Sequence, residues 1–281
     1  PGAREAEEMS TLALFRSMSR CCGAVAAWHW RDNLRRRRES EAGAPFDPEV
    51  NRAAVAEALG AAPPGALTER AAKALLAEYG IKVAGDTLTH SADAAVDAAR
   101  AIGFSVAMKA ESRQIAHKTD AGVVLLDLAS EHEVREAYAT IERRARAIGA
   151  DVRLDGIVVQ PMIPEGPEIM VGARCDPAFG PVLVVGLGGV MVELMKDVAR
   201  AIAPVTPARA RDMLASLRGR ALLDGFRGMP AVDMEALADA IARLSRLIAD
   251  HKELIAEIDV NPLICSPRGI VAVDALVVRR G

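Results

Sequence analysis

Apolar runs that follow one another at short intervals constrain the fold of this 281-residue chain more than any other feature. Between residues 156 and 194 the runs GIVVQPM, PEIMVGAR, PVLVVGLGG and VMVEL are separated by only a few residues. Strands joined by such short turns can pair antiparallel, whereas a parallel pair needs a crossover of about a dozen residues or more, usually a helix. The sequence therefore predicts an α+β fold with mostly antiparallel sheets, not a doubly wound parallel sheet.

Helical segments are expected on both sides of this strand-rich stretch. Thr68 can cap a helix that stops at Gly80, and Ser91 can cap one that ends at Gly103. Apolar residues recur at helical spacing over 134–148, and two later helices are expected at 207–218 and 233–250. Further strands are predicted at IKVA (81–84), FSVAMKA (104–110), GVVLLDL (122–128), ELIAEIDVNPLI (253–264) and GIVAVDALVV (269–278).

The first 60 residues differ from the rest. Residues 7–40 have a helical pattern, and both tryptophans lie there, at Trp28 and Trp30. The sequence AAPPGA (61–66) is the best linker candidate, because Pro-Pro-Gly cannot continue a helix. We therefore expect residues 1–60 to form a helical N-terminal segment with a linker.

Charge and composition exclude several classes of protein. The formal net charge is −3, which argues against a protein that binds nucleic acid or a membrane surface through a basic face. No apolar run reaches the roughly 20 residues of a membrane span. The cysteines at 21, 22, 175 and 265 form no CxxC pair, so a disulfide framework or a structural zinc site is not expected. A reducing cytoplasm fits this cysteine pattern best.

An acidic constellation lies near the C-terminal end. Alternate side chains of a strand share a face, so Glu257, Asp259 and Asn261 are expected to point the same way. Asp274 lies on the next strand, where a hairpin partner would face them. Carboxylate and amide oxygens suit Mg²⁺ held together with phosphate oxygens. The same alternation is typical of the polar face of an edge hairpin, so the residues alone leave both interpretations open.

Three other features carry possible chemistry. Lys109 sits inside an apolar strand, where its ammonium must reach water or an anion such as a phosphate. Gly186, Gly188 and Gly189 would let backbone N–H groups approach an anion, although they run into a strand rather than opening a helix, which argues against a dinucleotide-binding fold. His117 stands beside Lys118, and a lone histidine is more often structural or exposed than catalytic.

Five blocks of the sequence together resemble the ATP-grasp domain of NDP-forming acyl-CoA synthetases, the ADP-forming acetate–CoA ligase group, with succinyl-CoA synthetase β subunits as more distant relatives. The blocks are AAKALLAEYGIKVA, IGFSVAMKAESRQIAHKTDAG, the long stretch from GIVVQPM to MKDVA, LLDGFRGMPAVD, and EIDVNPL with the later VDA. They occur in the family's order and cover residues 67–278. The resemblance implies an ATP-grasp fold whose two subdomains, 61–160 and 161–281, clasp a nucleotide.

The resemblance also implies roles for particular residues. The family's His-Lys-Ser/Thr motif carries a phosphoryl group on its histidine, which implies this role for His117, followed by Lys118 and Thr119. Imidazole suits it, being partly neutral and nucleophilic near pH 7. We expect His117 on a mobile loop between Glu111 and Gly122. The other implied sites are Lys109, Val158, Val159, Gln160, Pro161, Met162, Ile163, Glu168, Gly188 and Gly189 for the nucleotide, with Val158–Ile163 as the hinge that reads adenine, and Asp259, Asn261 and Asp274 for Mg²⁺.

The implied reaction is acid + CoA + ATP to acyl-CoA + ADP + phosphate, with ATP/ADP and Mg²⁺ bound by this chain. The implied partner is a CoA-binding Rossmann and flavodoxin-like domain or an α-type subunit, in an enzyme expected to be oligomeric. An alternative is a regulatory, ligand-binding module of the kind found in fused protein-lysine acetyltransferases. Uptake of phosphate from labelled ATP would separate the two.

Overall fold

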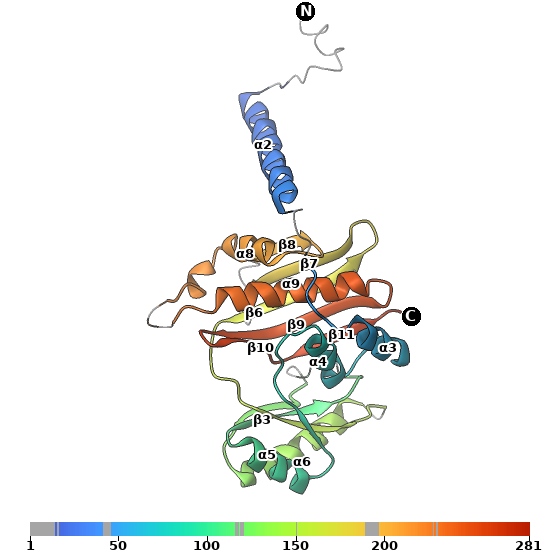
Figure 1. Ribbon diagram of the computed structural model, residues 1–281. Coiled ribbons are helices and arrows are strands. Elements are labelled where there is room, and N and C mark those ends of the chain that lie inside the picture. Colours follow the sequence, from blue (N-terminus) through green and yellow to red (C-terminus); the bar gives the residue numbers. More distant parts are fainter. Residues whose placement is uncertain are drawn as a thin grey trace, which may run out of the picture. The chain divides into compact units, whose positions relative to one another are not determined.

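The structure is a computed structural model that describes residues 15, 17–41, 46–115, 118, 121–149, 151–188, 197–226, 228 and 230–281. The chain divides into two compact units, Pro1–Pro45 and Phe46–Gly281. In the first unit, helix α2 (Met18–Glu41) is described (Figure 1). Trp28 and Trp30 are both exposed on it. None of the helices in the described part of the chain has the length and apolar character needed to cross a membrane.

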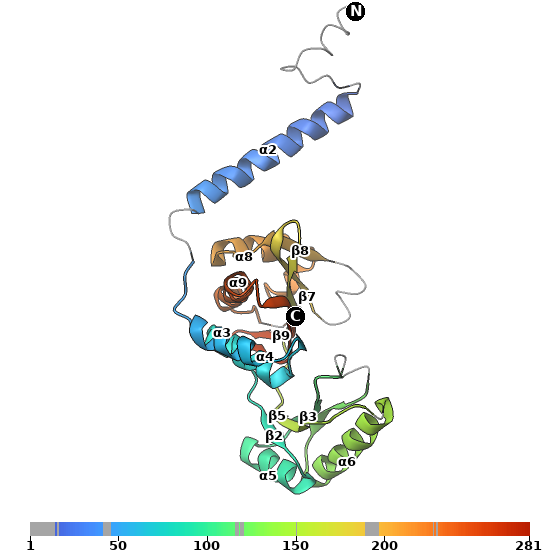
Figure 2. The same ribbon diagram turned by 90° about the vertical axis from the view of Figure 1, so that its right-hand side faces the viewer.

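The larger sheet of the second unit is antiparallel throughout. Its described strands run in the order β1-β11-β9-β6-β7-β8, and β10 pairs with β9. Helices α8 and α9 cover one of its faces (Figure 2). The strands are β1 (Gly65–Ala66), β6 (Glu168–Asp176), β7 (Gly180–Leu187), β8 (Val198–Ile202), β9 (Ile255–Ser266), β10 (Gly269–Ala272) and β11 (Ala275–Arg279), and the helices are α8 (Pro207–Ala215) and α9 (Met234–Asp250).

Two helices that precede the smaller sheet in sequence pack with the larger one. Helix α3 (Arg52–Ala61) and helix α4 (Glu69–Glu78) contact each other, and α4 packs on β11. Val55, Leu59 and Leu76 from these helices are fully buried in the larger core. Thr68 caps α4 as expected, by accepting a hydrogen bond from the Ala71 N–H at 3.3 Å. The larger sheet and its core therefore include helices α3 and α4, which come before the smaller sheet in the sequence.

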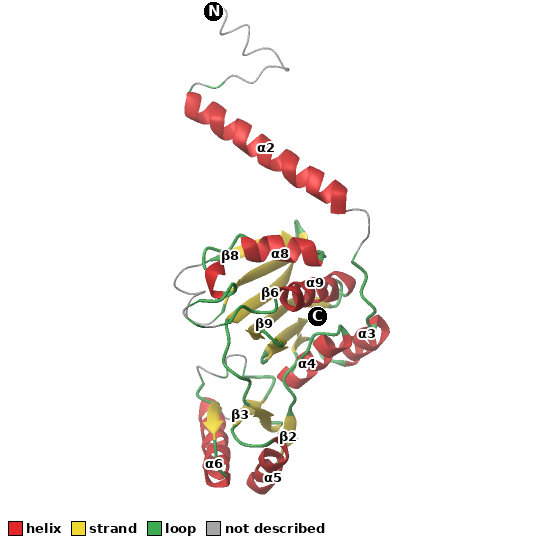
Figure 3. Cartoon of the chain, turned by 60° about the vertical axis from the view of Figure 1, so that its left-hand side comes forward, coloured by secondary structure: helices red, strands yellow, loops and turns green. Residues whose placement is uncertain are grey.

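The smaller sheet has the order β2-β5-β3-β4 and is also antiparallel. Helices α5 and α6 lie against it and enclose a second apolar core (Figure 3). Its elements are β2 (Thr87–Thr89), α5 (Ala92–Ile102), β3 (Val106–Glu111), β4 (Val124–Leu128), α6 (Glu131–Ile148) and β5 (Gly156–Pro161). The predicted α+β fold with two antiparallel sheets is confirmed.

The central strand β3 shows how this sheet positions the site. All six of its residues are buried. Val106, Met108 and Ala110 belong to the apolar core, whereas the alternate residues Ala107 and Lys109 line a cleft on the opposite face.

Some predicted elements differ from the structure. IKVA is not a strand: Val83 makes an isolated bridge to Ala272, flanked by one backbone hydrogen bond on each side. The run 269–278 is divided at Val273 and Asp274 into β10 and β11, which pair with different parts of β9. The helix expected at 207–218 ends at Ala215. The expected strand 190–194 lies outside the described residues.

Candidate active site

A cleft of about 780 Å³ lies where the two sheets meet. One wall of the cleft comes from the smaller sheet. The opposite wall comes from β9 and from the connection between β10 and β11. The segment between β5 and β6, which joins the two sheets, closes the cleft. The lining residues are Ala107, Lys109, Val124, Leu126, Asp127, Gln160, Pro161, Met162, Ile163, Pro164, Glu165, Gly166, Glu168, Asn261, Pro262, Ile264, Val273 and Asp274. A volume of several hundred Å³ with a mixed lining is typical of a small-molecule site.

The lining suits a ligand with a flat apolar part and a charged part. Leu126, Met162 and Ile163 offer apolar surface, and Lys109 offers a cation. Most of the residues predicted for the nucleotide meet here: Lys109, Gln160, Pro161, Met162, Ile163 and Glu168. Val159 does not line the cleft, because its side chain is fully buried in the core of the smaller sheet, and its neighbour Val158 is 2% exposed.

Lys109 is 4% exposed, so its ammonium must be satisfied by the protein or by a ligand. The ammonium donates to Glu69 Oε1 at 2.9 Å and to the Val273 carbonyl at 3.2 Å. Asp274 Oδ2 lies 3.9 Å from the same nitrogen. The sequence predicted an anion for this lysine, and the protein itself supplies one in Glu69.

Glu69 is the centre of a buried ionic cluster. Besides Lys109, its Oε1 lies 3.0 Å from Lys73 Nζ, and its Oε2 accepts a hydrogen bond from Lys118 Nζ. Burial alone would raise the pKa of the Glu69 carboxyl, but the charges of Lys109, Lys118 and Lys73 outweigh this effect and lower the pKa to about 2. Burial alone would lower the pKa of Lys118, but the carboxylates Glu69, Asp274 and Glu111 together raise it above its ordinary value. Both groups therefore stay charged.

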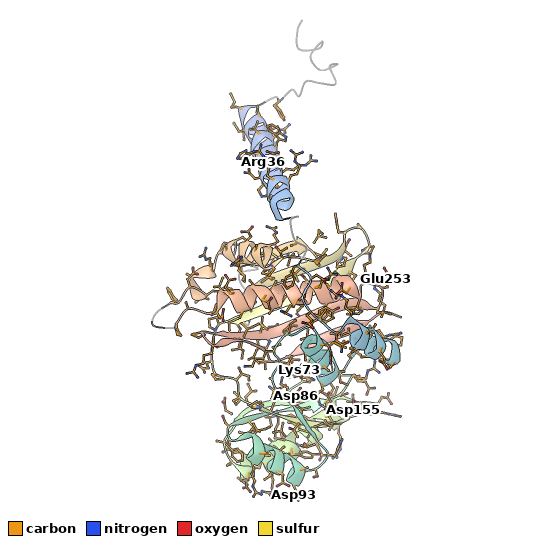
Figure 4. The ribbon with its side chains drawn as sticks, viewed as in Figure 1. Arg36, Lys73, Asp86, Asp93, Asp155 and Glu253 are labelled. Carbon is orange, nitrogen blue, oxygen red and sulfur yellow. The ribbon has the colours of Figure 1, made fainter. Side chains whose placement is uncertain are left out.

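Lys73 extends this cluster to the hinge. Its ammonium donates to both carboxylate oxygens of Asp86, at 3.0 and 3.2 Å, and to Gln160 Oε1 at 3.3 Å. Figure 4 labels Lys73 and Asp86, which lie close together between α4 and the smaller sheet. Burial raises the pKa of Asp86, although Lys73 acts in the opposite direction. A continuous buried polar network thus connects Gln160, near the end of β5, with Lys109 and Lys118.

The predicted magnesium residues are divided between two neighbouring sites. Asn261 and Asp274 line the cleft, whereas Asp259 lines an adjoining groove with Glu257 and Arg174. Burial raises the pKa of Asp274, and Glu69 adds to this, while Lys109 and Lys118 oppose it. Within the described ranges, no group of three or more His, Cys, Asp or Glu is placed to hold a metal. The donors in the cleft, a carboxylate and an amide oxygen, still fit Mg²⁺, which commonly keeps water and phosphate oxygens as its other ligands.

Other predicted residues are placed differently or lie outside the described part. Gly188 lies against β6, where its N–H donates to the Glu168 carbonyl at 2.6 Å and an added Cβ would come within 2.9 Å of the Glu168 Cβ. His117, Thr119 and Gly189 lie outside the described residues, as does part of the loop expected to be mobile. Lys118, next to His117 in the chain, is described and is 8% exposed.

Sequence reasoning missed Glu69, Lys73 and Asp86. A signal for two of them was present. Glu69 and Lys73 are four residues apart on α4, on the same stripe as the buried Leu76. An acid and a lysine on the apolar stripe of a helix predict a buried ion pair, because neither charge is tolerated there alone.

The comparison with protein families decides the classification. The model described as the ATP-grasp domain matches residues 58–278. This chain belongs to the ATP-grasp family. The ATP-grasp chain is 38% identical over 218 residues to the β subunit of ADP-forming acetate–CoA ligase II of Pyrococcus furiosus, a match that covers 77% of this chain and 92% of that subunit. It is 39% identical over 203 residues to the ADP-forming 4-hydroxybutyrate–CoA ligase of Nitrosopumilus maritimus, covering 72% of this chain but only 29% of that enzyme.

A solved structure agrees with this assignment. The dinucleotide-forming acetyl-coenzyme A synthetase 1 of Ca. Korarchaeum cryptofilum, in complex with coenzyme A and Ca-AMPCP, is 41% identical with a TM-score of 0.76, over 82% of this chain and 99% of that one. A second structure of that protein, with coenzyme A and Mg-AMPPCP, has its phosphohistidine segment pointing towards the nucleotide binding site; it is 42% identical with a TM-score of 0.66, over 76% of this chain and 93% of that one. The ATP-grasp chain thus belongs to the family of β-type subunits and domains of ADP-forming acyl-CoA synthetases, as the sequence predicted.

Proposed function

We propose that this chain binds Mg-ATP or Mg-ADP and transfers a phosphoryl group between the nucleotide and His117, as one step of an ADP-forming acyl-CoA synthetase. The full reaction is acid + CoA + ATP to acyl-CoA + ADP + phosphate. The observation that carries the proposal is the cleft in which the hinge, Lys109, Asn261 and Asp274 meet, beside a polar network that ends at Lys118. The similarity to the β subunit of an ADP-forming acetate–CoA ligase supports it.

In this proposal the hinge Val158–Ile163 holds the adenine, with Glu168 near the ribose and Gly188 and Gly189 near the phosphates. Lys109 neutralises charge on the phosphates, for which its buried position near Asp274 is suited. Asn261 and Asp274, which line the cleft, are the proposed protein ligands of Mg²⁺, with Asp259 from the groove as a proposed third. The metal, when bound, would neutralise phosphate charge and orient the transferred group.

The transfer step involves His117. A neutral imidazole nitrogen attacks the γ-phosphorus of ATP, a new N–P bond forms, and the bond from that phosphorus to the oxygen bridging to the β-phosphate breaks, so that ADP leaves. The reverse step returns the phosphoryl group to ADP. The chain's main contribution is positioning and charge neutralisation, because phosphoryl transfer demands little covalent chemistry from the protein.

The acyl and CoA chemistry is assigned to a partner. The chain spans 29% of the length of the 4-hydroxybutyrate–CoA ligase but 92% of a β subunit, which supports a partner for this chain. The proposed partner is a CoA-binding Rossmann and flavodoxin-like domain or an α-type subunit. The phosphoryl group on His117 would pass to that partner, in an oligomeric complete enzyme. We expect acyl-CoA from acid, CoA and ATP only when chain and partner are mixed, and production by the purified chain alone would refute this division of labour.

The test is phosphate uptake from ATP labelled at the γ-phosphate. The purified chain should take up label in the presence of Mg²⁺, and added ADP should remove it. His117→Asn should take up none but still bind Mg-ATP in calorimetry, since Asn remains polar and lacks the nucleophilic ring. Mg-ATP binding without labelling of the wild type would favour a regulatory nucleotide-binding module, and labelling of His117→Asn at the wild-type rate would exclude the relay.

A further inference from the structure

Glu69 contacts two lysines that belong to different parts of the proposed reaction. Its Oε1 accepts from Lys109, which lines the cleft, at 2.9 Å. Its Oε2 accepts from Lys118, which directly follows His117 in the chain. One carboxylate therefore holds a lysine at the phosphate end of the cleft and the lysine beside the phosphoryl acceptor.

Backbone contacts fix the same arrangement from the other side. The Val123 N–H donates to the Lys118 carbonyl at 3.0 Å, and the Ala110 N–H donates to the Val123 carbonyl at 3.0 Å. Ala110 follows Lys109 on β3, so the backbone of Lys118 is connected to the strand that carries Lys109. Glu69 comes from α4, which packs on β11 of the larger sheet. The carboxylate thus joins both lysines to the layer that carries Asn261 and Asp274.

All three charged groups are buried, so the position of each lysine is fixed by its contact with Glu69. Glu69, Lys109 and Lys118 are 5%, 4% and 8% exposed. A buried ammonium that loses its counter-charge costs several kcal/mol, so each lysine is held where Glu69 can reach it. Misplacing a reacting group by about 1 Å can cost about a hundredfold in rate.

We propose that Glu69 is a positioning residue for phosphoryl transfer: it holds Lys118, and thereby the chain beside His117, in register with Lys109 and the phosphates. This inference rests on the proposed function. Glu69 does not touch the reacting atoms in this mechanism and acts through the two lysines.

The experiment compares Glu69→Gln with the control Asp250→Asn. Asp250 is a part-buried carboxylate at the end of α9 that accepts hydrogen bonds from Arg52 and Tyr79, and it does not line the cleft. At saturating Mg-ATP, Glu69→Gln should slow labelling by about tenfold to a hundredfold. Its affinity for Mg-ATP should change by a smaller factor, and Asp250→Asn should label at close to the wild-type rate. If the loss of any hydrogen-bonded carboxylate slowed labelling through the stability of the fold alone, both variants would lose similar amounts, and that result would overturn the proposal.

A double-variant cycle tests the route through Lys118. If Glu69 acts by holding Lys118, Glu69→Gln should slow labelling much less in a Lys118→Gln background than in the wild type. Fully additive losses would contradict this route. Should Glu69→Gln fail to melt cooperatively, Glu69→Asp keeps the charge but shortens the side chain by one methylene, and wild-type labelling by that variant would refute the proposal.

The outcomes separate this inference from the proposed function. A wild-type chain that binds Mg-ATP but takes up no label refutes the phosphoryl relay and the role of Glu69 with it. A wild type that is labelled, together with a Glu69→Gln variant that is labelled equally fast, refutes only the role of Glu69.

Discussion

Gly166 has no room for a side chain. A Cβ at this position would lie 2.1 Å from the carbonyl oxygen of Cys265, a backbone atom of β9. Because Gly166 lines the cleft, Gly166→Ala should destabilise the fold by about 1–3 kcal/mol and weaken Mg-ATP binding. Thermal melting should show a decrease of about 2–4 °C for each kcal/mol.

The control for this variant is Gly60→Ala. Gly60 lies in helix α3 and has nothing within 4 Å of an added Cβ. Alanine there should stabilise the chain by about 0.5–1 kcal/mol. Equal melting temperatures for the two variants would show that the cleft tolerates movement of β9 at Cys265.

The Glu69 carboxyl should make stability depend on pH. Its folded-state pKa is about 2 and its ordinary value is 4.5, so the ionised form is favoured by folding. The resulting stabilisation, about 3 kcal/mol, is fully present above about pH 4.5 and is lost as the pH falls towards 2. Denaturant unfolding between pH 5 and pH 3 should show a steeper loss for the wild type than for Glu69→Gln, and parallel curves would contradict this prediction.

The sequence predicted that a buried charged residue needs a partner better than it predicted which residue that partner is. The position of Lys109 in an apolar strand was sufficient to predict an anion near its ammonium. The sequence did not identify Glu69 as that anion, because the two residues are 40 positions apart and come from different layers. Asp259 and Asn261 follow strand alternation, but alternation does not predict that one lines a groove and the other a cleft.

At the scale of elements, the cap of α4 supports both the fold and the site. Thr68→Ala removes the acceptor for the Ala71 N–H and should cost about 1 kcal/mol. Thr206→Ala removes the equivalent cap of α8, which accepts from the Arg209 N–H at 3.1 Å. Both variants should melt at similarly reduced temperatures. Only Thr68→Ala should slow labelling from ATP, because α4 carries Glu69 and Lys73. Equal labelling rates for the two variants would show that the cap of α4 does not affect the site.

Elements with strong local signals were predicted closely, and those that depend on distant pairing were not. Helix α9 was expected at 233–250 and spans Met234–Asp250, since a capping Asp233 and a long apolar stripe specify it locally. IKVA has the composition of a strand, yet it pairs with Ala272 through an isolated bridge, and the Ile81 N–H donates to the Leu76 carbonyl of α4 instead of to a strand. The break between β10 and β11 likewise follows from pairing with β9, and within the run GIVAVDALVV only Asp274 favours a turn at that point.

At the scale of the whole molecule, residues 46–281 should fold and function as a unit. Among the described residues, both apolar cores are built from Val50 onwards. A chain that starts at Phe46 should therefore melt within about 2 °C of the full chain, because it keeps every described core residue. It should also label from ATP at the same rate, and a large loss of either property would assign a structural role to the first 45 residues.

The pairing of β1 with β11 has a consequence for gene architecture. Gly65 and Ala66 stand opposite Arg279 and Val278, so the polypeptide enters the larger sheet and leaves it at the same corner. A sheet that the chain enters and leaves at one corner can be carried within a longer reading frame, or released from one, with little disturbance of its interior. Both arrangements occur among the relatives, one encoded as a separate subunit and the other as less than a third of a long polypeptide. Recombination between genes can therefore place such a module either in a subunit of its own or inside a longer polypeptide.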